Sequence, residues 1–412
     1  MTESDMGHTE GAKEAELSRQ DWRMLPLLSL LTIVVIANAM SITARLIARQ
    51  AHFEASGSML PCLVLGDLST GVRGIPGTVC TEKYHEDSQP VEYRFNSSGY
   101  RADVPFGPKK QGTYRIVVVG SSFAMGMHVP AEKTFTALLP GALSSRTGRN
   151  VEVFNEGMHT GFAGRVALSL NDALAVEPDM ILWVLTVHDV KGASVLAPES
   201  VAMQDDLQSA SASIGPTGPL SALKTEFIGH PPLDAIRELW NRSEESFVLL
   251  HYVYESQSLY LNSSLMPGRE SDYLRVNPSA EWQSKLTQFA NYSAKIESKA
   301  RGAGVPLVAV YFPLRAPAAM VSIGQWPKGF DPYKFDDELR SIITSQGATY
   351  IDILPDFRSI PNPEQNYLPI DGHPTAAGHG ILTELLAKEL TSGAVPALRA
   401  TGEMQTAPQK GN

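Results

Sequence analysis

The sequence lacks the features that define several classes of protein. It has two cysteines in 412 residues, too few for a disulfide-rich scaffold or a cysteine-rich zinc site. Basic residues are outnumbered, with 34 Lys and Arg against 44 Asp and Glu and a formal net charge of −10, so no basic excess is available to neutralise nucleic-acid phosphates. No two histidines have metal-ligand spacing on a clear helix, and no glycine-rich phosphate loop occurs. We therefore expect no nucleic-acid partner, no metal and no cofactor.

The chain has enough apolar residues to bury a core. Hydrophobic residues make up 43% and charged residues 19% of the sequence, as in globular proteins, and the length suits one large or two ordinary domains. The polar residues 1–23 predict a disordered tail. Residues 45–112, rich in Gly and Pro, predict a lead-in to a main domain at 113–392, which has a helical insertion at about 190–300. Residues 393–412 predict a flexible tail.

An uncharged stretch lies near the N-terminus. Met24–Ala44 holds no charged residue and has an arginine on each side, and about 20 such residues are enough for a transmembrane helix. The small-residue pattern at 37–39 leaves a cleaved signal peptide as an alternative, and a buried core helix is a second one. We favour a signal anchor, with the rest of the chain exported.

The two cysteines both follow this stretch. Cys62 and Cys80 flank a glycine-rich segment that is not expected to hold itself in place. In an oxidising compartment a disulfide would close this loop and stabilise the protein by about 3 kcal/mol. Two unrelated buried thiols are the alternative, and we favour the disulfide if the chain is exported.

Strands and helices alternate through the main domain. A near-continuous apolar run at 114–120 is typical of a strand buried on both faces of a parallel sheet. Further strands are expected at 151–157, 180–187, 305–313 and 348–354. Helices are expected at 130–148, 164–176, 247–261, 281–301, 335–347 and 373–390. A short strand is expected within 91–101. This alternation predicts an α/β fold, a three-layer sandwich with a parallel sheet covered on both faces.

Polar residues follow the strands, at the edge where open α/β sheets form their sites. Ser122 follows the first strand, and His373 and Asp371 precede the last helix. A serine nucleophile needs a base to take its proton, and the base needs a partner that fixes its tautomer. We assign Ser122 as nucleophile, His373 as base and Asp371 as the residue that orients it. Backbone N–H groups of Ser122 and Gly157 and a side chain from the third strand end would stabilise the oxyanion.

These residues resemble the blocks of the SGNH hydrolases, or GDSL esterases. GSSFAMG (120–126) resembles the nucleophile block, NEG (155–157) ends on the oxyanion-hole glycine, TVHD (186–189) resembles the third block, and DGH (371–373) resembles the last. FNSSGYR (95–101) and HPTAAGH (373–379) also look like a membrane-anchored bacterial branch. The resemblance covers roughly 91–189 and 303–390. It implies a flavodoxin-like sheet, the SGNH hydrolase fold.

The sequence departs from the family at four points. Ser121 stands in place of an aspartate, and Thr186 in place of a glycine. His188 stands at the oxyanion-hole asparagine, where an imidazole can still donate one hydrogen bond. One residue rather than two separates Asp371 from the histidine, a spacing that also looks like acetyltransferases of exopolysaccharide assembly.

Four other residues near the blocks are weaker candidates. His159 and Asp189 are assigned to substrate binding, with an exposed loop histidine and a loop-holding aspartate as the respective alternatives. His128 is not expected to reach the pocket. His379 is expected to lie on the same helix as the catalytic histidine, as a structural or surface residue.

The resemblance implies a serine esterase or O-acyltransferase that forms an acyl-enzyme. The expected substrates are small esters or acylated polysaccharide, above all O-acetyl groups of cell-envelope or exported polysaccharide. The expected location is the bacterial inner membrane, as a single-pass protein with a periplasmic or extracellular catalytic domain. Two alternatives stay open: a non-catalytic scaffold that binds glycan in an assembly complex, and a lipase or thioesterase whose insertion forms an apolar lid. The sequence leaves the oligomeric state open.

Overall fold

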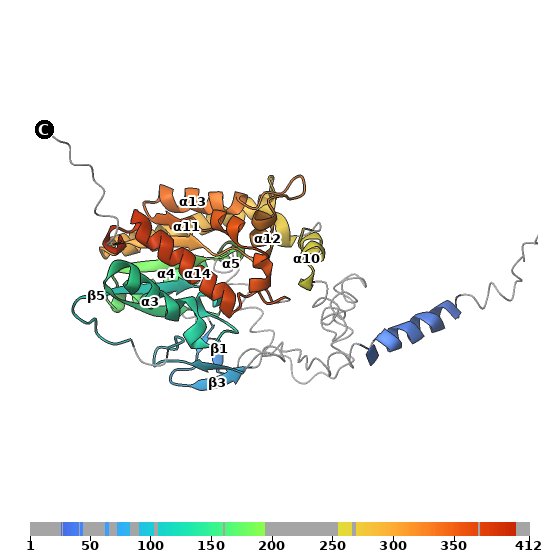
Figure 1. Ribbon diagram of the computed structural model, residues 1–412, viewed down its shortest axis with the longest axis horizontal. Helices are drawn as coiled ribbons and strands as arrows, with labels where there is room; N and C mark the ends of the chain where they lie inside the picture. Colours follow the sequence, from blue (N-terminus) through green and yellow to red (C-terminus); the bar gives the residue numbers. More distant parts are fainter. Residues whose placement is uncertain are drawn as a thin grey trace, which may run out of the picture.

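The computed structural model describes the main domain and parts of the segments before it (Figure 1). The described residues are 26, 28–40, 42–43, 62–65, 72–82, 90–102, 106–159, 161–193, 254–265, 269–369 and 371–400.

A five-stranded parallel sheet forms the centre of the main domain, in the order β6–β5–β7–β8–β9. The strands are β5 (Thr113–Gly120), β6 (Asn150–Gly157), β7 (Met180–Leu185), β8 (Leu307–Tyr311) and β9 (Thr349–Ile351). Every residue of β5, β7 and β8 is buried, because helices cover both faces of the sheet. This confirms the predicted α/β class with a parallel sheet.

Two groups of helices cover the sheet. One group is α3 (Phe135–Thr147) with α14 (Ala376–Glu389), and the other is α4 (Ala163–Ala175), α11 (Ala280–Gly302) and α13 (Lys334–Ser345). The chain runs outward from β5 to β6 and then back across to β7, so right-handed crossovers put the two groups on opposite faces. The reversal leaves a crevice at the carboxyl end of β5, where sites form in such sheets.

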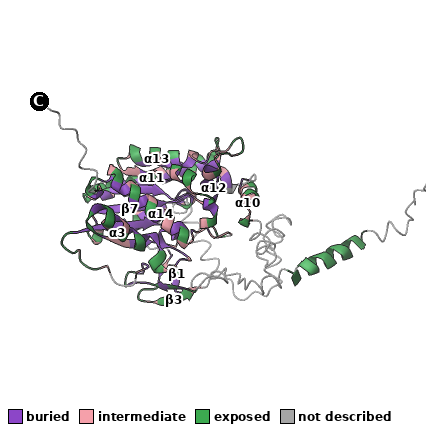
Figure 2. Ribbon diagram, in the orientation of Figure 1, coloured by how far each residue is buried: buried purple, intermediate pink, exposed green. Residues whose placement is uncertain are grey.

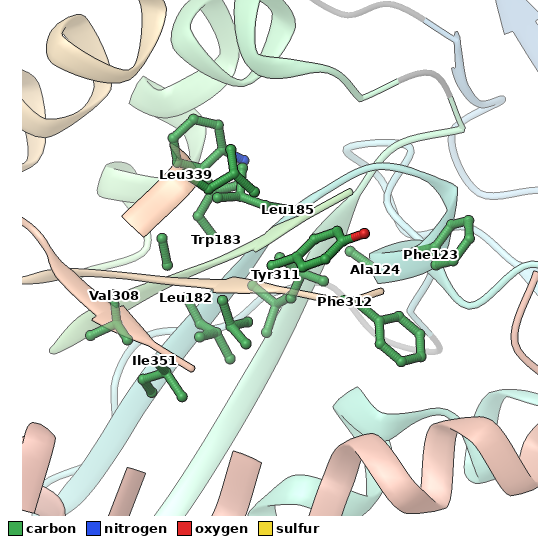
Figure 3. Packing of buried hydrophobic residues seen from close by; sticks show 14 of the residues in the cluster. Phe123, Ala124, Leu182, Trp183, Leu185, Val308, Tyr311, Phe312, Leu339 and Ile351 are labelled. Carbon is green, nitrogen blue, oxygen red and sulfur yellow. The ribbon is translucent and has the colours of Figure 1, made fainter. Parts of the chain in front are cut away.

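Shorter elements connect these layers. They are α2 (Ser122–Met125), η1 (Ala131–Lys133), α5 (Val187–Lys191), α10 (Gln257–Ser264), η3 (Arg269–Leu274), α12 (Arg315–Ile323), η4 (Pro355–Ser359), η5 (Pro363–Asn366), η6 (Leu390–Ala394) and η7 (Pro396–Leu398). Figure 3 shows Phe123 of α2 near Phe312, which follows β8. Their ring centroids are 5.7 Å apart in an edge-to-face arrangement, so the turn after β5 is anchored in the main core.

The lead-in forms a small module of its own rather than a plain connection. It has two antiparallel hairpins, β1 (Leu63–Leu65) with β2 (Val72–Gly74) and β3 (Val79–Glu82) with β4 (Val91–Arg94). The structure joins Cys62 and Cys80 in a disulfide. A second buried cluster combines lead-in residues with residues at and just after α2: Cys62, Leu63, Val72, Val91, Tyr93, Phe95, Met125 and Met127. The lead-in therefore packs directly against the turn that carries Ser122.

Several predicted boundaries were wrong. The last helix begins at Ala376, after its N-cap Thr375, so His373 lies in a loop and not on the helix of His379. Helix α12 was not predicted, because Pro317 in its first turn made the segment look like a loop. Part of the predicted C-terminal tail is packed, with Leu398 fully buried.

The predicted N-terminal anchor is only partly described. Residues 28–40 form a helix whose apolar side chains are exposed (Figure 2). Among the described residues, no helix combines the length and the apolar character that a membrane span requires. The polar tail at 1–23 and most of the predicted insertion, residues 194–253, lie outside the described residues.

Candidate active site

Ser122 is placed by a tight turn between β5 and α2. A Cβ on Gly120 would lie 2.6 Å from the Val184 carbonyl oxygen, and its φ of +150° suits only glycine. Ser121 then caps α2, because its hydroxyl accepts a hydrogen bond from the Phe123 N–H at 3.4 Å. Ser122 is the first residue of the helix and sits at the sheet edge.

The structure brings the three predicted catalytic side chains together. His373 Nε2 lies 2.7 Å from Ser122 Oγ, and His373 Nδ1 forms a hydrogen bond with Asp371 Oδ1. The His373 backbone N–H donates to the same carboxylate oxygen at 3.1 Å. A single intervening residue therefore suffices, because the loop folds so that Asp371 bonds both the ring and the backbone of His373. This is the geometry of a nucleophile, a base and an orienting carboxylate.

Asp371 is also close to a second imidazole. His128 Nε2 lies 3.7 Å from Asp371 Oδ1, and His128 Nδ1 lies 3.0 Å from Glu82 Oε2. Burial alone would raise the pKa of Asp371, but the interactions with His128 and His373 outweigh it and hold that pKa well below its usual range. The expectation that His128 stays away from the pocket was wrong. Glu82 was not predicted, because it lies in a hairpin 40 residues before Ser122.

The ligand atoms of His128, Asp371 and His373 all lie within 4.8 Å of one another. By distance alone, such a group can hold a metal ion. However, His128 faces two carboxylates, which favour its protonated form, and a protonated imidazole has no lone pair for a metal. We assign no metal to this group.

Two of the predicted oxyanion donors, His188 and the Gly157 N–H, differ in whether the donor group is already engaged. His188 is in the first turn of α5, and its ring centroid is 6.3 Å from that of Phe123. The Gly157 N–H donates to Asn155 Oδ1 at 2.9 Å, so its hydrogen is already engaged. Gly157 instead serves packing, since a Cβ there would lie 2.3 Å from the Met125 nitrogen.

Asp189 does not line the site. It is completely buried, and its Oδ2 accepts hydrogen bonds from the Thr186 N–H at 2.8 Å and the Thr186 hydroxyl at 3.2 Å. These bonds cap α5. Burial raises the pKa of Asp189 to about 7 despite the bonds from Thr186. Its assignment to substrate binding was therefore wrong, and the loop-holding alternative describes it.

The structure also places the two remaining candidate histidines, His159 and His379. His159 is half-buried near the catalytic loop, where burial first and then the charges of His373 and His128 lower its pKa. His379 is fully buried, and its Nδ1 accepts a hydrogen bond from the Phe135 N–H at 3.3 Å. Burial lowers the pKa of His379 to about 3, so it is a neutral structural residue and not a surface one.

A cavity of about 530 Å³ opens beside the catalytic loop. Phe123, His188, Asp371 and His373 are among the residues that line it. The rest of the lining comes mainly from the insertion and the start of α12, and it mixes aromatic, hydroxyl, basic and aliphatic side chains: Lys191, Tyr254, Tyr260, Ser263, Ser264, Ser271, Tyr273, Leu274, Leu314 and Arg315.

Arg315 fixes part of this cavity wall. Its guanidinium donates to the Pro369 carbonyl at 2.8 Å and to the Tyr254 carbonyl, and it lies over the Tyr260 ring at 4.1 Å. The described end of the insertion is thus tied to the catalytic loop. Sequence reasoning missed Arg315 because it overlooked α12.

Arg101 supports the nucleophile turn from the lead-in. Its guanidinium donates to the carbonyls of Gly126 and of Val129, the latter at 2.7 Å, and it lies over the Tyr93 ring at 4.2 Å. These carbonyls belong to the C-cap of α2 and to the turn after it. The FNSSGYR segment singled out in the sequence ends on this arginine, so that signal was available, although its role was not recognised.

No protein-family model and no curated protein matches the chain. Solved structures that are similar include TesA, at 13% identity over 68% of this chain and 98% of that one, with a TM-score of 0.35. A mutant of Axe2, an acetyl-xylooligosaccharide esterase from Geobacillus stearothermophilus, matches at 12% identity over 68% and 96%, with a TM-score of 0.37. AlinE4, an SGNH-hydrolase family esterase, matches at 12% over 69% and 98%, with a TM-score of 0.33. At these identities and TM-scores the similarity carries no argument about activity, which depends on the geometry above.

Proposed function

We propose that the protein is a serine esterase or O-acyltransferase of the SGNH type that works through an acyl-enzyme. One observation carries the proposal: the unbroken chain from Ser122 Oγ through His373 to Asp371, at the carboxyl edge of the sheet and beside a cavity. The departures at Ser121 and Thr186 remove no catalytic group, since both residues cap the helices that position the site.

The reaction follows from the order of these three side chains, from Ser122 through His373 to Asp371. Ser122 Oγ attacks the ester carbonyl carbon while its proton passes to His373 Nε2. Asp371 holds the ring by its Nδ1 hydrogen and stabilises the imidazolium. The carbon–oxygen bond of the tetrahedral intermediate then breaks, and the leaving alcohol takes the proton from Nε2. Water or a sugar hydroxyl attacks the acyl-enzyme in the same way, which releases the acid or the new ester and restores Ser122.

The oxyanion needs hydrogen-bond donors near Ser122. We assign this role to the Ser122 N–H in the first turn of α2 and to the His188 imidazole on the cavity wall. Gly157 is the weaker candidate, because its N–H is bonded to Asn155.

For the substrate, we propose O-acetyl groups on cell-envelope or exported polysaccharide. Tyrosines, serines and Lys191 among the lining residues suit a ligand rich in hydroxyl groups. The disulfide suits an oxidising compartment. We accordingly propose a periplasmic or extracellular catalytic domain anchored in the inner membrane by its N-terminal helix.

Turnover of p-nitrophenyl acetate by the full chain tests the proposed reaction. The wild type should release nitrophenol, and Ser122→Ala and His373→Ala should lose at least about 10³-fold in kcat/KM. Ser145→Ala is the matched control, because Ser145 is an exposed serine on α3. A folded protein without activity would favour the glycan-binding scaffold.

Ester substrates with acyl chains of increasing length distinguish a deacetylase from the remaining alternative, a lipase or thioesterase. A deacetylase should lose kcat/KM steadily as the acyl chain grows from acetyl to octanoyl. A lipase or thioesterase would gain it instead, because an apolar lid contributes about 0.8 kcal/mol for each buried CH₂ group.

A further inference from the structure

His128 has a backbone conformation that costs free energy. Its φ is +62°, in the left-handed region that favours glycine. Among the described residues only two other non-glycine residues, Glu177 and Asn362, share a positive φ, and both are exposed. Non-glycine residues persist in such conformations where the surrounding structure holds them, often at functional sites.

The lead-in module holds His128 through a network of three hydrogen bonds, two of which involve His128 itself. The His128 N–H donates to the Tyr93 hydroxyl at 2.7 Å, and that hydroxyl donates to Glu82 Oε2 at 2.9 Å. The same carboxylate oxygen lies 3.0 Å from His128 Nδ1. The His128 side chain is only 5% exposed. Its ring orientation is therefore set by β3 and β4, and its second nitrogen points toward the catalytic loop.

Both ring nitrogens of His128 face carboxylates. Glu82 is at 3.0 Å from Nδ1, and Asp371 is at 3.7 Å from Nε2, an ion-pair distance rather than a hydrogen bond. A neutral imidazole carries one N–H and would turn a lone pair toward one of them, so only the imidazolium suits both. Burial opposes this charge, but the interactions with Asp371 and Glu82 outweigh it and raise the pKa of His128 to about 9.

We propose that His128, as an imidazolium clamped by Glu82, is a positioning residue that keeps Asp371 ionised and oriented toward His373. The inference rests on the proposed serine esterase mechanism. Glu82 adds a second negative charge to the group. Two carboxylates (Glu82 and Asp371) and one imidazolium (His128) leave one net negative charge beside His373. The imidazolium that forms at His373 during the reaction is therefore still stabilised, although a second imidazolium lies nearby with its ring centroid 5.4 Å away.

Every element packed around His128 contributes to its electrostatic environment. The titratable and charged groups that face it are Glu82, Tyr93, Arg101, His159, Asp371 and His373. Of these, the two carboxylates are the direct partners of the ring. Loss of the His128 proton above pH about 9 should therefore weaken the alignment of Asp371 and create an alkaline limb in kcat.

Substitutions at position 128 separate this role from a structural one. His128→Gly relieves the backbone conformation while it removes the ring. For the full chain we expect kcat for p-nitrophenyl acetate to fall at least tenfold and KM to change less than twofold. The loss of kcat should occur at temperatures where the variant is still folded, as its melting curve shows. Glu177→Gly, at a φ of +54°, is the control for relief of a positive φ alone and should leave kcat unchanged.

The pH profile gives a readout that a structural role would not produce. The wild type should lose kcat above pH about 9, and His128→Gln should have a lower kcat without that limb. An unchanged kcat in both His128 variants, or a wild-type limb that persists in His128→Gln, would overturn the inference.

Histidine NMR distinguishes failure of this inference from failure of the proposed function. The His128 ring should stay protonated to about pH 9 in the full chain and titrate at lower pH in Glu82→Gln, whether or not the protein turns over esters. Titration of wild-type His128 near the ordinary value of about 6.5 would overturn the inference alone. Absence of ester turnover with the expected titration would contradict the proposed enzyme and, with it, the positioning role.

Discussion

At the scale of residues, the departures from the SGNH pattern have structural explanations. The Ser121 hydroxyl caps α2, and Thr186 with Asp189 caps α5. Each cap satisfies backbone N–H groups at the start of a helix that presents a site residue. A substitution in a motif can thus preserve the site when the new side chain satisfies the same backbone.

His188 is the one departure at a position proposed to bind the oxyanion. If its imidazole donates to the oxyanion, His188→Ala should lower kcat about 10²-fold with little effect on KM. His188→Asn restores a neutral donor and should recover most of the activity. Steady-state kinetics with p-nitrophenyl acetate measures both variants. Equal kcat values in the wild type and His188→Ala would exclude the role.

Glu156 is a buried acid outside the catalytic chain. It is 3% exposed, and burial, together with the nearby charge of Asp172, raises its pKa to about 8 although Arg73 lowers it. The folded state therefore binds this proton more tightly than the unfolded chain. The resulting stability is fully present below the unfolded pKa of 4.5 and is lost as the pH rises through about 8.

Glu156→Gln removes this dependence. The variant should be more stable than the wild type at pH 9, by on the order of 5 kcal/mol, and the difference should shrink toward pH 5. Urea unfolding at the two pH values measures it. A stability difference that does not change with pH would contradict the buried, protonated state of Glu156.

At the scale of elements, the lead-in hairpins are part of the active-site support. The disulfide joins Cys62 to Cys80, two residues before Glu82 in β3. Tyr93 and Arg101, from β4 and the turn after it, contact the segment that follows Ser122. Stability of the lead-in and geometry of the catalytic loop are therefore coupled.

Loss of the disulfide should affect both stability and activity. The double variant Cys62→Ser, Cys80→Ser should lose about 3 kcal/mol of stability. It should also lose part of its kcat at temperatures where it is still folded, because Glu82 is held less firmly. Thermal unfolding and ester turnover on the same samples measure the two effects. Full kcat in a destabilised double variant would show that the hairpins are only a structural cover.

The sequence predicted some elements better than others, for physical reasons. The strand 114–120 was recognised because it is a near-continuous apolar run, and the structure has it at Thr113–Gly120. The strand expected at 151–157 is present at Asn150–Gly157, although its sequence is mixed. Helix α12 was missed because a proline in the first helical turn reads locally as a loop signal. In the lead-in, the short strand expected within 91–101 is β4 (Val91–Arg94), whose residues alternate between buried and exposed. Strands β1, β2 and β3 were missed because three or four residues carry little periodicity.

At the scale of the whole molecule, topology explains how distant residues meet. Ser122 and His373 are separated by 251 positions, yet both lie at the carboxyl edge of one parallel sheet. The alternation of strands and helices was enough to predict that meeting. The contribution of Glu82 and His128 was not predictable, because no periodic pattern shows where an antiparallel hairpin outside the sheet will pack.

The central claim is that Ser122 is a nucleophile activated by His373. The most direct test is mass spectrometry of the folded full chain after reaction with a fluorophosphonate, followed by peptide mapping. We predict one adduct, on Ser122, that is absent from Ser122→Ala and forms much more slowly in His373→Ala. A folded protein that stays unmodified at Ser122, or that carries its adduct on another residue, would contradict the account.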